Sequence, residues 1–157
     1  MTLALFAAIA ALTAAPADVQ SVPPLEPVRF QKVAKDDGAS SRLQKRTGFA
    51  IRGEKRWKRT WRKLTATIQP RPRRPRVDFS RHMLLVAVQG RQPSGGHAAT
   101  ITDVGDTGGS LIVDVDDVSP GPGCITTGVI TSPYHVVRIR RSRDSISFQR
   151  HPVERDC

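Results

Sequence analysis

The best candidates for nucleophilic catalysis in this chain are Ser94 and one of the four histidines His82, His97, His135 and His151. A nucleophilic triad requires a Ser or Cys held beside an oriented His. Ser94 lies in a Pro-Ser-Gly-Gly segment that is typical of a tight turn, and the G-x-S-x-G pattern of a nucleophile elbow does not occur in the sequence. We therefore expect no catalytic residues, and a protein that is not an enzyme.

The acidic residues also lack the spacing of a chemical site. Asp114, Asp116 and Asp117 fall on alternating or loop positions, which does not place two carboxylates at one pocket. The sequence contains neither a C-x-x-C pair nor a Cys/His cluster, and the Gly95-Gly96 pair is not followed by the Lys and Ser/Thr of a phosphate-binding loop. We expect no metal, no cofactor and no small-molecule substrate.

The two cysteines are Cys124, in a Pro/Gly-rich loop, and Cys157. In an oxidising compartment, a disulfide between them would close a loop of about thirty residues and stabilise the fold by roughly 3 to 4 kcal/mol. Two separate thiols are the alternative, and the sequence leaves both open.

Residues 1–17 have the features of a signal peptide. An uncharged apolar run from Leu3 to Ala15 is too short to span a bilayer comfortably, and it ends in the small-x-small triplet Ala15-Pro16-Ala17. This predicts cleavage before Asp18 and export to the bacterial periplasm or the extracellular space, with an uncleaved N-terminal anchor as the main alternative. No Cys lies near the cleavage position, so a lipoprotein is not expected.

One segment makes the protein basic. The chain has a formal net charge of +11, and residues 42–76 hold 14 Lys and Arg against the single acid Glu54. Within it, residues 53–66 are predicted to form an amphipathic helix with a cationic outer face. Its apolar stripe has helical spacing and comprises Trp57, Trp61, Leu64 and Ile68.

Tryptophans among Arg and Lys could bind nucleic acid, lipopolysaccharide or an anionic membrane surface. Both indoles, however, share their stripe with Leu64, which favours packing of the helix on a sheet. The cations would then contribute only weak anion binding; they are Lys55, Arg59, Arg62, Lys63, Arg73 and Arg74. Residues 69–76 (QPRPRRPR) are predicted to be an extended, basic, Pro-rich linker outside the core.

Alternating apolar residues predict β-strands through most of the remaining chain. The expected strands are 28–33, 48–51, 83–89, 97–104, 111–115, 125–131, 134–140 and 145–149. The almost wholly apolar strand 83–89 should be central in its sheet, and strand 145–149 should pair back on the preceding strand with Ile146 and Phe148 inward. The fold class is α+β: a mainly antiparallel β-sheet or sandwich with one amphipathic helix packed on it.

Five motifs, in order along the chain, resemble the PrcB C-terminal domain family. They are the Trp57-xxx-Trp61 helix, Val77-Asp78-Phe79-Ser80 before MLLVAV, the segment 90–96 (GRQPSGG), the segment 119–124 (SPGPGC) and the segment 131–137 (TSPYHVV). The resemblance implies association with a protease, because the parent protein of the family is a subunit of a protease complex. It implies no peptidase activity of this chain.

The segment 90–96 has a structural interpretation, in which Gly95 and Gly96 adopt positive φ in a turn, and a functional one, in which a rigid loop docks on a partner. The second predicts a binding surface with Tyr134 as an aromatic anchor. Its residues are Gln92, Pro93, Ser94, Gly95, Gly96, His97, Pro133 and Tyr134.

The chain is thus divided into a signal peptide (1–17), a disordered N-terminus (18–27), a PrcB C-terminal-like domain (28–151) and a C-terminal tail (152–157). The expected function is that of an exported, non-catalytic, protein-binding domain, an accessory, stabilising or inhibitory partner of a protease or other envelope protein. The alternative is an anion-binding protein that uses its basic helix and linker.

Overall fold

Strand β4 (His82–Val88) lies at the centre of the fold because it is apolar on both faces. In the computed structural model, which describes residues 25–38 and 41–157, all six residues from Met83 to Val88 are fully buried. Met83, Leu85 and Ala87 pack between two sheets, while Leu84, Val86 and Val88 pack under a helix. Because β4 has a strand on each side, its predicted central position is confirmed.

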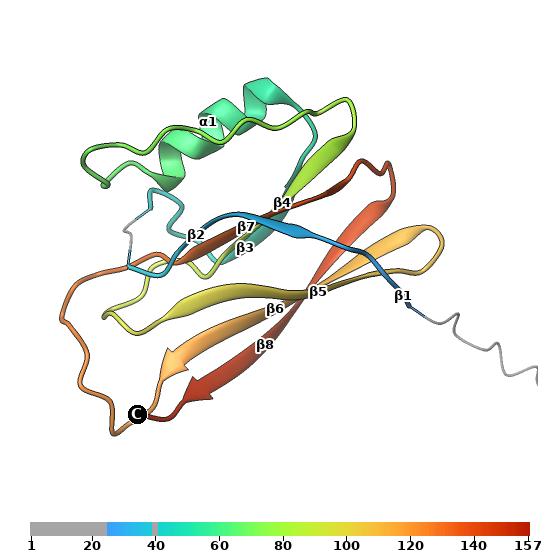
Figure 1. Cartoon of the computed structure of the whole chain (residues 1–157). Helices are drawn as coiled ribbons and strands as arrows, with labels where there is room; N and C mark the ends of the chain where they lie inside the picture. Colours follow the sequence, from blue (N-terminus) through green and yellow to red (C-terminus); the bar gives the residue numbers. More distant parts are fainter. Residues whose placement is uncertain (1–24, 39–40) are drawn as a thin grey trace, which may run out of the picture.

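The other elements arrange themselves around β4 as three layers: the helix, one sheet and a second sheet (Figure 1). In chain order they are β1 (Glu26–Pro27), β2 (Gln31–Asp36), β3 (Thr47–Ile51), α1 (Glu54–Leu64), β5 (Ala98–Asp106), β6 (Ser110–Pro120), β7 (Tyr134–Arg140) and β8 (Ser145–Arg155). The sheet under α1 has the order β2-β7-β4-β3, and the outer sheet has the order β1-β5-β6-β8. The predicted α+β class, mainly antiparallel with one packed helix, is confirmed.

Each interface between layers has its own apolar core. Trp57, Trp61 and Leu64 of α1 pack on the β2-β7-β4-β3 sheet. The core between the sheets includes Val113 and Val137, with the predicted inward residues Ile146 and Phe148 packed against it. The predicted helix and three residues of its apolar stripe are therefore confirmed. Because α1 ends at Leu64, the fourth, Ile68, lies beyond the helix and packs against the same core. Within the described residues, no helix is both long and apolar enough to cross a membrane.

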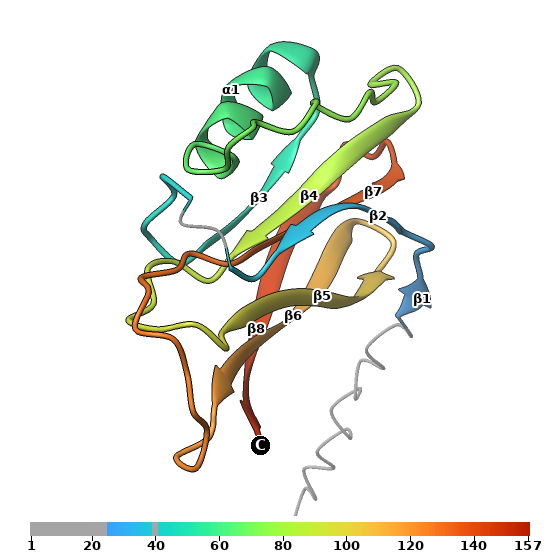
Figure 2. The same ribbon diagram turned by 60° about the vertical axis from the view of Figure 1, so that its left-hand side comes forward.

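The predicted pairing of the last strand with β7 is wrong. Strand β8 crosses to the other sheet and pairs in parallel with β6, from Ser110 opposite Ser145 to Pro120 opposite Arg155 (Figure 2). The turn between β7 and β8 is tied to the residue that follows β3, because the Arg52 guanidinium donates hydrogen bonds to the carbonyls of Ser142 and Asp144. Strand β8 also continues to Arg155, into the segment that was expected to be a tail.

The predicted strand 125–131 is likewise wrong. Residues 121–133 follow an irregular path and include an isolated bridge between Gln92 and Thr131. The apolar side chains of Ile125, Val129 and Ile130 are exposed, so no core holds this segment in a sheet.

The N-terminal strands are shifted from the prediction. Strand β1 begins inside the segment 18–27 that was expected to be disordered, and β2 ends at Asp36. The expected signal peptide, residues 1–17, lies outside the described residues.

Candidate functional site

The segment after β4 is fastened to the irregular segment after β6 by backbone hydrogen bonds. The amide of Gln92 donates to the Thr131 carbonyl at 2.8 Å, and the Thr131 amide donates to the Gln92 carbonyl at 3.1 Å. The Gly95 amide also donates to the Thr127 carbonyl at 2.9 Å. Residues 91–96 and 124–131, called the paired loops below, therefore form one surface at one end of the sandwich (Figure 1).

Glycine is required in these loops for two different reasons. Gly96 has φ of 83°, as predicted, a conformation that L side chains rarely adopt. Gly95 does not have positive φ, so that part of the prediction is wrong. Instead, a Cβ atom at Gly95 would lie 2.5 Å from Oγ1 of Thr127. The close approach of the two loops, rather than strain, favours glycine at position 95.

The paired loops are also anchored to the end of the chain. Cys124 and Cys157 form a disulfide with their Cα atoms 5.3 Å apart. Beside it, the Gly121 amide donates a hydrogen bond of 3.0 Å to the carbonyl of Arg155 in β8. The segment that leaves β6 is thus held at both ends, by the disulfide at Cys124 and by the bridge at Thr131.

Three residues that the sequence placed on the binding surface are buried. Tyr134 is 2% exposed and packs in the core under α1, where burial, together with the Asp36 carboxylate, raises its pKa to about 12. His97 is 9% exposed, and burial lowers its pKa, against the opposing effect of a hydrogen bond with the backbone of Val118. Neither can serve as an exposed anchor. Pro133 is buried as well.

The remaining predicted residues do lie in the paired loops. Pro93 and Gly96 are exposed, whereas Gln92, Ser94 and Gly95 are half-buried. The Ser94 hydroxyl donates to the Gly95 carbonyl at 3.1 Å, and the Ser94 carbonyl accepts from Oγ1 of Thr131 at 2.9 Å. Ser94 therefore acts in the structure of the loop.

The exposed apolar side chains of the paired loops were missed by the sequence analysis. They are Ile125, which is fully exposed, Val129 at 58% and Ile130 at 41%. Val129 also lines a cleft of about 400 Å³, to which the other loop contributes Gly95 and Gly96. His97, which follows that loop, and Arg155 of the C-terminal strand line the same cleft. The β-branched residues of 125–131 suggested a strand, so the sequence analysis did not identify them as surface residues.

The two tryptophans of α1 do not reach the surface. Trp57 is 0% and Trp61 6% exposed, which confirms that they pack in the core. Their indole groups donate hydrogen bonds to the carbonyls of Pro75 at 3.0 Å and Pro72 at 3.2 Å. The Pro-rich segment is mostly solvent-exposed, as predicted, but these two bonds fix its backbone against the helix.

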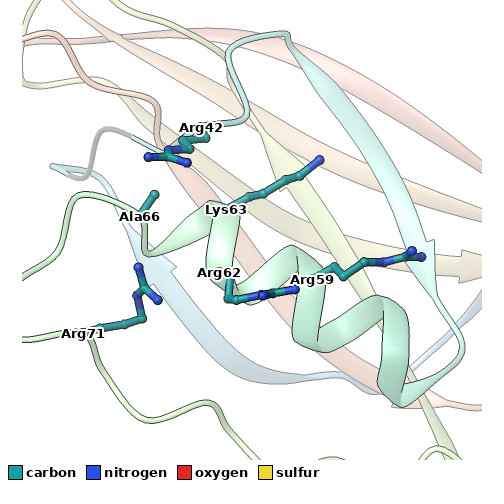
Figure 3. Close-up of a pocket in the computed structure, with 6 residues that line it drawn as sticks. All are labelled: Arg42, Arg59, Arg62, Lys63, Ala66 and Arg71. Carbon is teal, nitrogen blue, oxygen red and sulfur yellow. The ribbon is translucent and has the colours of Figure 1, made fainter.

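The predicted cations separate into three groups. Arg74 forms an ion pair of 2.5 Å with Glu54. Arg59, Arg62 and Lys63 line a groove beside α1, whose other lining residues are Arg42, Ala66 and Arg71 (Figure 3). Lys55 and Arg73 do not line this groove, and Arg42 and Arg71 were not predicted to.

The structure describes no cluster of three or more His, Cys, Asp or Glu side chains suited to a metal ion in residues 25–38 and 41–157. His135 is buried in the sandwich, where its Nδ1 accepts a hydrogen bond of 2.9 Å from the Ile101 amide. This histidine belongs to the core.

The fold and the site together define a helix-covered β-sandwich that presents a disulfide-anchored loop surface at one end. The model of the family described as PrcB C-terminal matches residues 83–140, from β4 to the end of β7. This match supports the resemblance to the PrcB C-terminal domain family that the sequence motifs carry. The matched span contains both of the paired loops. No curated protein and no solved structure shows a significant match.

Proposed function

We propose that this protein is an exported, non-catalytic binding domain that acts as an accessory, stabilising or inhibitory partner of a protease or another envelope protein. The PrcB C-terminal family suggests a domain associated with a protease complex. The observation that carries the proposal for this chain is the exposure of Val129 and Ile130 on loops that are fixed at both ends.

This arrangement suits protein binding for two reasons. Apolar side chains surrounded by a polar rim are typical of the centre of a protein–protein interface. Because hydrogen bonds and a disulfide already hold the paired loops, little conformational entropy is lost when a partner covers them. The partner contact is thus assigned to Val129, Ile130 and the exposed Pro93, in place of Tyr134 and His97.

The disulfide supports export. Disulfides form and persist in oxidising compartments and are rare in the cytosol. A domain that depends on Cys124–Cys157 to anchor its binding surface would function in the periplasm or outside the cell.

The test is affinity capture from the envelope fraction with three immobilised forms of the protein. They are the wild type, a Val129→Glu/Ile130→Glu variant and a Leu25→Glu control. Leu25 is also an exposed apolar residue, at 54%, but it lies directly before β1. We expect a partner that the wild type and the control retain and that the double variant binds at least tenfold more weakly.

The purified partner would then be titrated at low and high salt. Docking through an apolar surface should be nearly independent of salt, whereas binding through many cations should weaken steeply. A partner that the double variant binds as tightly as the wild type does would contradict the assignment to the paired loops.

A further inference from the structure

The groove beside α1 brings five cationic side chains together: Arg42, Arg59, Arg62, Lys63 and Arg71. It has a volume of about 350 Å³, and no acidic residue lines it. Among the residues that the structure describes, none of the five forms an ion pair with an acid; the basic side chains that do are Lys35, Arg46, Arg74, Arg150 and His151. The groove therefore holds a concentration of positive charge without a counter-charge.

The five cations come from three different segments of the chain. Arg59, Arg62 and Lys63 project from the second half of α1, Arg42 precedes β3, and Arg71 follows the helix. Figure 3 shows the Arg71 side chain directed toward Ala66, with Arg42 on the other side of that residue. Such convergence differs from a solvated helix face, in which all charges come from one element.

The backbones that carry these cations are tied to one another. The Arg42 amide donates a hydrogen bond of 2.9 Å to the carbonyl of Lys63, at the end of α1. The residue after Arg71 is Pro72, whose carbonyl accepts the hydrogen bond from the Trp61 indole at 3.2 Å. The positions of the three segments are consequently fixed before any ligand binds.

The hydrogen bonds between these segments hold the cations close together against their mutual repulsion. On the helix, Arg59 stands three residues before Arg62 and four before Lys63, and like charges at these spacings destabilise a helix. By contrast, Arg56 on the same helix has a partner, because its guanidinium lies 5.2 Å from the centre of the Phe49 ring. An anion in the groove would relieve the repulsion among the other cations.

The surroundings of the groove narrow the class of anion. Single-stranded nucleic acid is usually held by aromatic side chains on which bases stack, but Trp57 and Trp61 are buried. Insertion into a membrane requires exposed apolar residues, and the large ones that are described lie elsewhere, at Leu25, Ile125, Val129, Ile130 and Val153. What remains is recognition by charge and by guanidinium hydrogen bonds, which suits phosphate groups.

We propose that this groove is a binding site for a compact anion that carries two or more phosphate groups. Arginine forks would bind the phosphate oxygens, and the ligand would bridge α1 to the segments at Arg42 and Arg71. The free anion and a phosphorylated lipid headgroup share this chemistry. The site is separate from the paired loops and does not depend on the function proposed for them.

The test compares two variants with the same loss of charge. The groove variant is Arg62→Gln/Arg71→Gln, and the control is Arg140→Gln/Arg143→Gln, which changes two exposed arginines at the end of β7 and in the turn after it. The probe is tripolyphosphate, titrated by calorimetry at about 150 mM salt so that diffuse attraction is screened. Thermal melting of each variant without ligand verifies that it is folded.

We expect the groove variant to bind tripolyphosphate at least tenfold more weakly than the wild type, and the control to stay within twofold of it. A second arm measures binding to vesicles that contain phosphatidic acid. If the groove variant also loses binding to these vesicles, the ligand is a lipid headgroup. If it loses binding to tripolyphosphate alone, the ligand is a soluble anion. An equal loss in both variants would overturn the proposal, as would absence of tripolyphosphate binding by the wild type. The proposal would also be overturned if the wild type bound an oligothymidylate more tightly than tripolyphosphate and the groove variant kept that binding.

Discussion

The indole Nε1 of Trp57 donates a hydrogen bond of 3.0 Å to the carbonyl of Pro75, a residue 18 positions further along the chain. The ring of Trp57 also contacts that of Trp61, with ring centres 5.2 Å apart, and both residues pack on the sheet below α1. A single pair of side chains thus attaches the helix to the sheet on one side and the Pro-rich segment to the helix on the other.

Trp57→Ala should therefore destabilise the fold by roughly 3 to 5 kcal/mol, the usual cost of emptying a large buried site. Trp57→Phe keeps much of the packing but loses the hydrogen bond to Pro75, and it should cost less, about 1 to 3 kcal/mol. Urea unfolding monitored by circular dichroism measures both values. Arg59→Ala, on the exposed face of the same helix, should stay within about 0.5 kcal/mol of the wild type. A cost below 1 kcal/mol for Trp57→Ala would contradict this account.

Gly90 and Gly108 offer a matched comparison, because both have positive φ, 86° and 83° respectively. A Cβ at Gly108 would meet nothing within 4 Å, whereas one at Gly90 would lie 2.6 Å from the backbone nitrogen of Arg46. Gly108→Ala should cost about 1 kcal/mol from backbone strain alone. Gly90→Ala should cost about 1 to 3 kcal/mol more, because the backbone at Arg46 must move. Equal unfolding midpoints for the two variants would show that the contact at Arg46 is unimportant.

His135 should make the fold sensitive to acid. Burial, with the charges of Lys35 and Lys32, lowers its pKa from 6.5 to about 4. Between these two values the unfolded chain binds a proton that the folded chain does not, so stability is lost as the pH falls from about 6.5 to 4, and it is unaffected at higher pH. The loss from this residue is on the order of 3 kcal/mol, and His97, whose pKa is also lowered, acts in the same direction.

The measurement is the free energy of unfolding at pH 7, 6, 5 and 4 for the wild type and for His135→Asn. The Asn side chain can still accept the hydrogen bond from Ile101 but does not titrate in this range. The variant should therefore show a much smaller loss between pH 6.5 and 4. The same pH dependence in both proteins would mean that other groups cause it.

The disulfide should stabilise both the fold and the loop surface. Cys124 and Cys157 are separated by 33 positions, and for a loop of this length the loop-closure model gives roughly 3 to 4 kcal/mol. In a Cys124→Ser/Cys157→Ser variant, we expect that loss in urea unfolding, together with faster hydrogen exchange at Gly121, whose amide bonds to Arg155. Unchanged exchange there would show that β8 and the paired loops stay together without the disulfide.

Local sequence patterns predicted the helix and the strands whose buried faces are clearly apolar. The 3.6-residue spacing of Trp57, Trp61 and Leu64 defined α1, and the run Met83–Val88 could only be a strand that is covered on both sides. Strand β7 was predicted with its observed limits, because the β-branched and aromatic residues between Tyr134 and Arg140 are typical of a strand.

The sequence could not show which segments of the chain lie side by side in the fold. Ile146 and Phe148 show which face of β8 is buried, but the same alternation is compatible with pairing to β7 or to β6. The paired loops depend on hydrogen bonds between residues more than thirty positions apart, and the groove on the distance between Arg42 and Arg71. Such relationships between distant segments arise only when the chain is folded.

The central claim is that a protein partner covers the paired loops, and hydrogen exchange of the complex with the captured partner tests it most directly. We predict slower exchange in residues 91–96 and 124–131 on binding and no change in residues 54–76, which comprise α1 and the Pro-rich segment. The Val129→Glu/Ile130→Glu variant should show neither binding nor protection. Protection confined to residues 54–76, with 124–131 unchanged, would contradict the account and place the partner on the basic face instead.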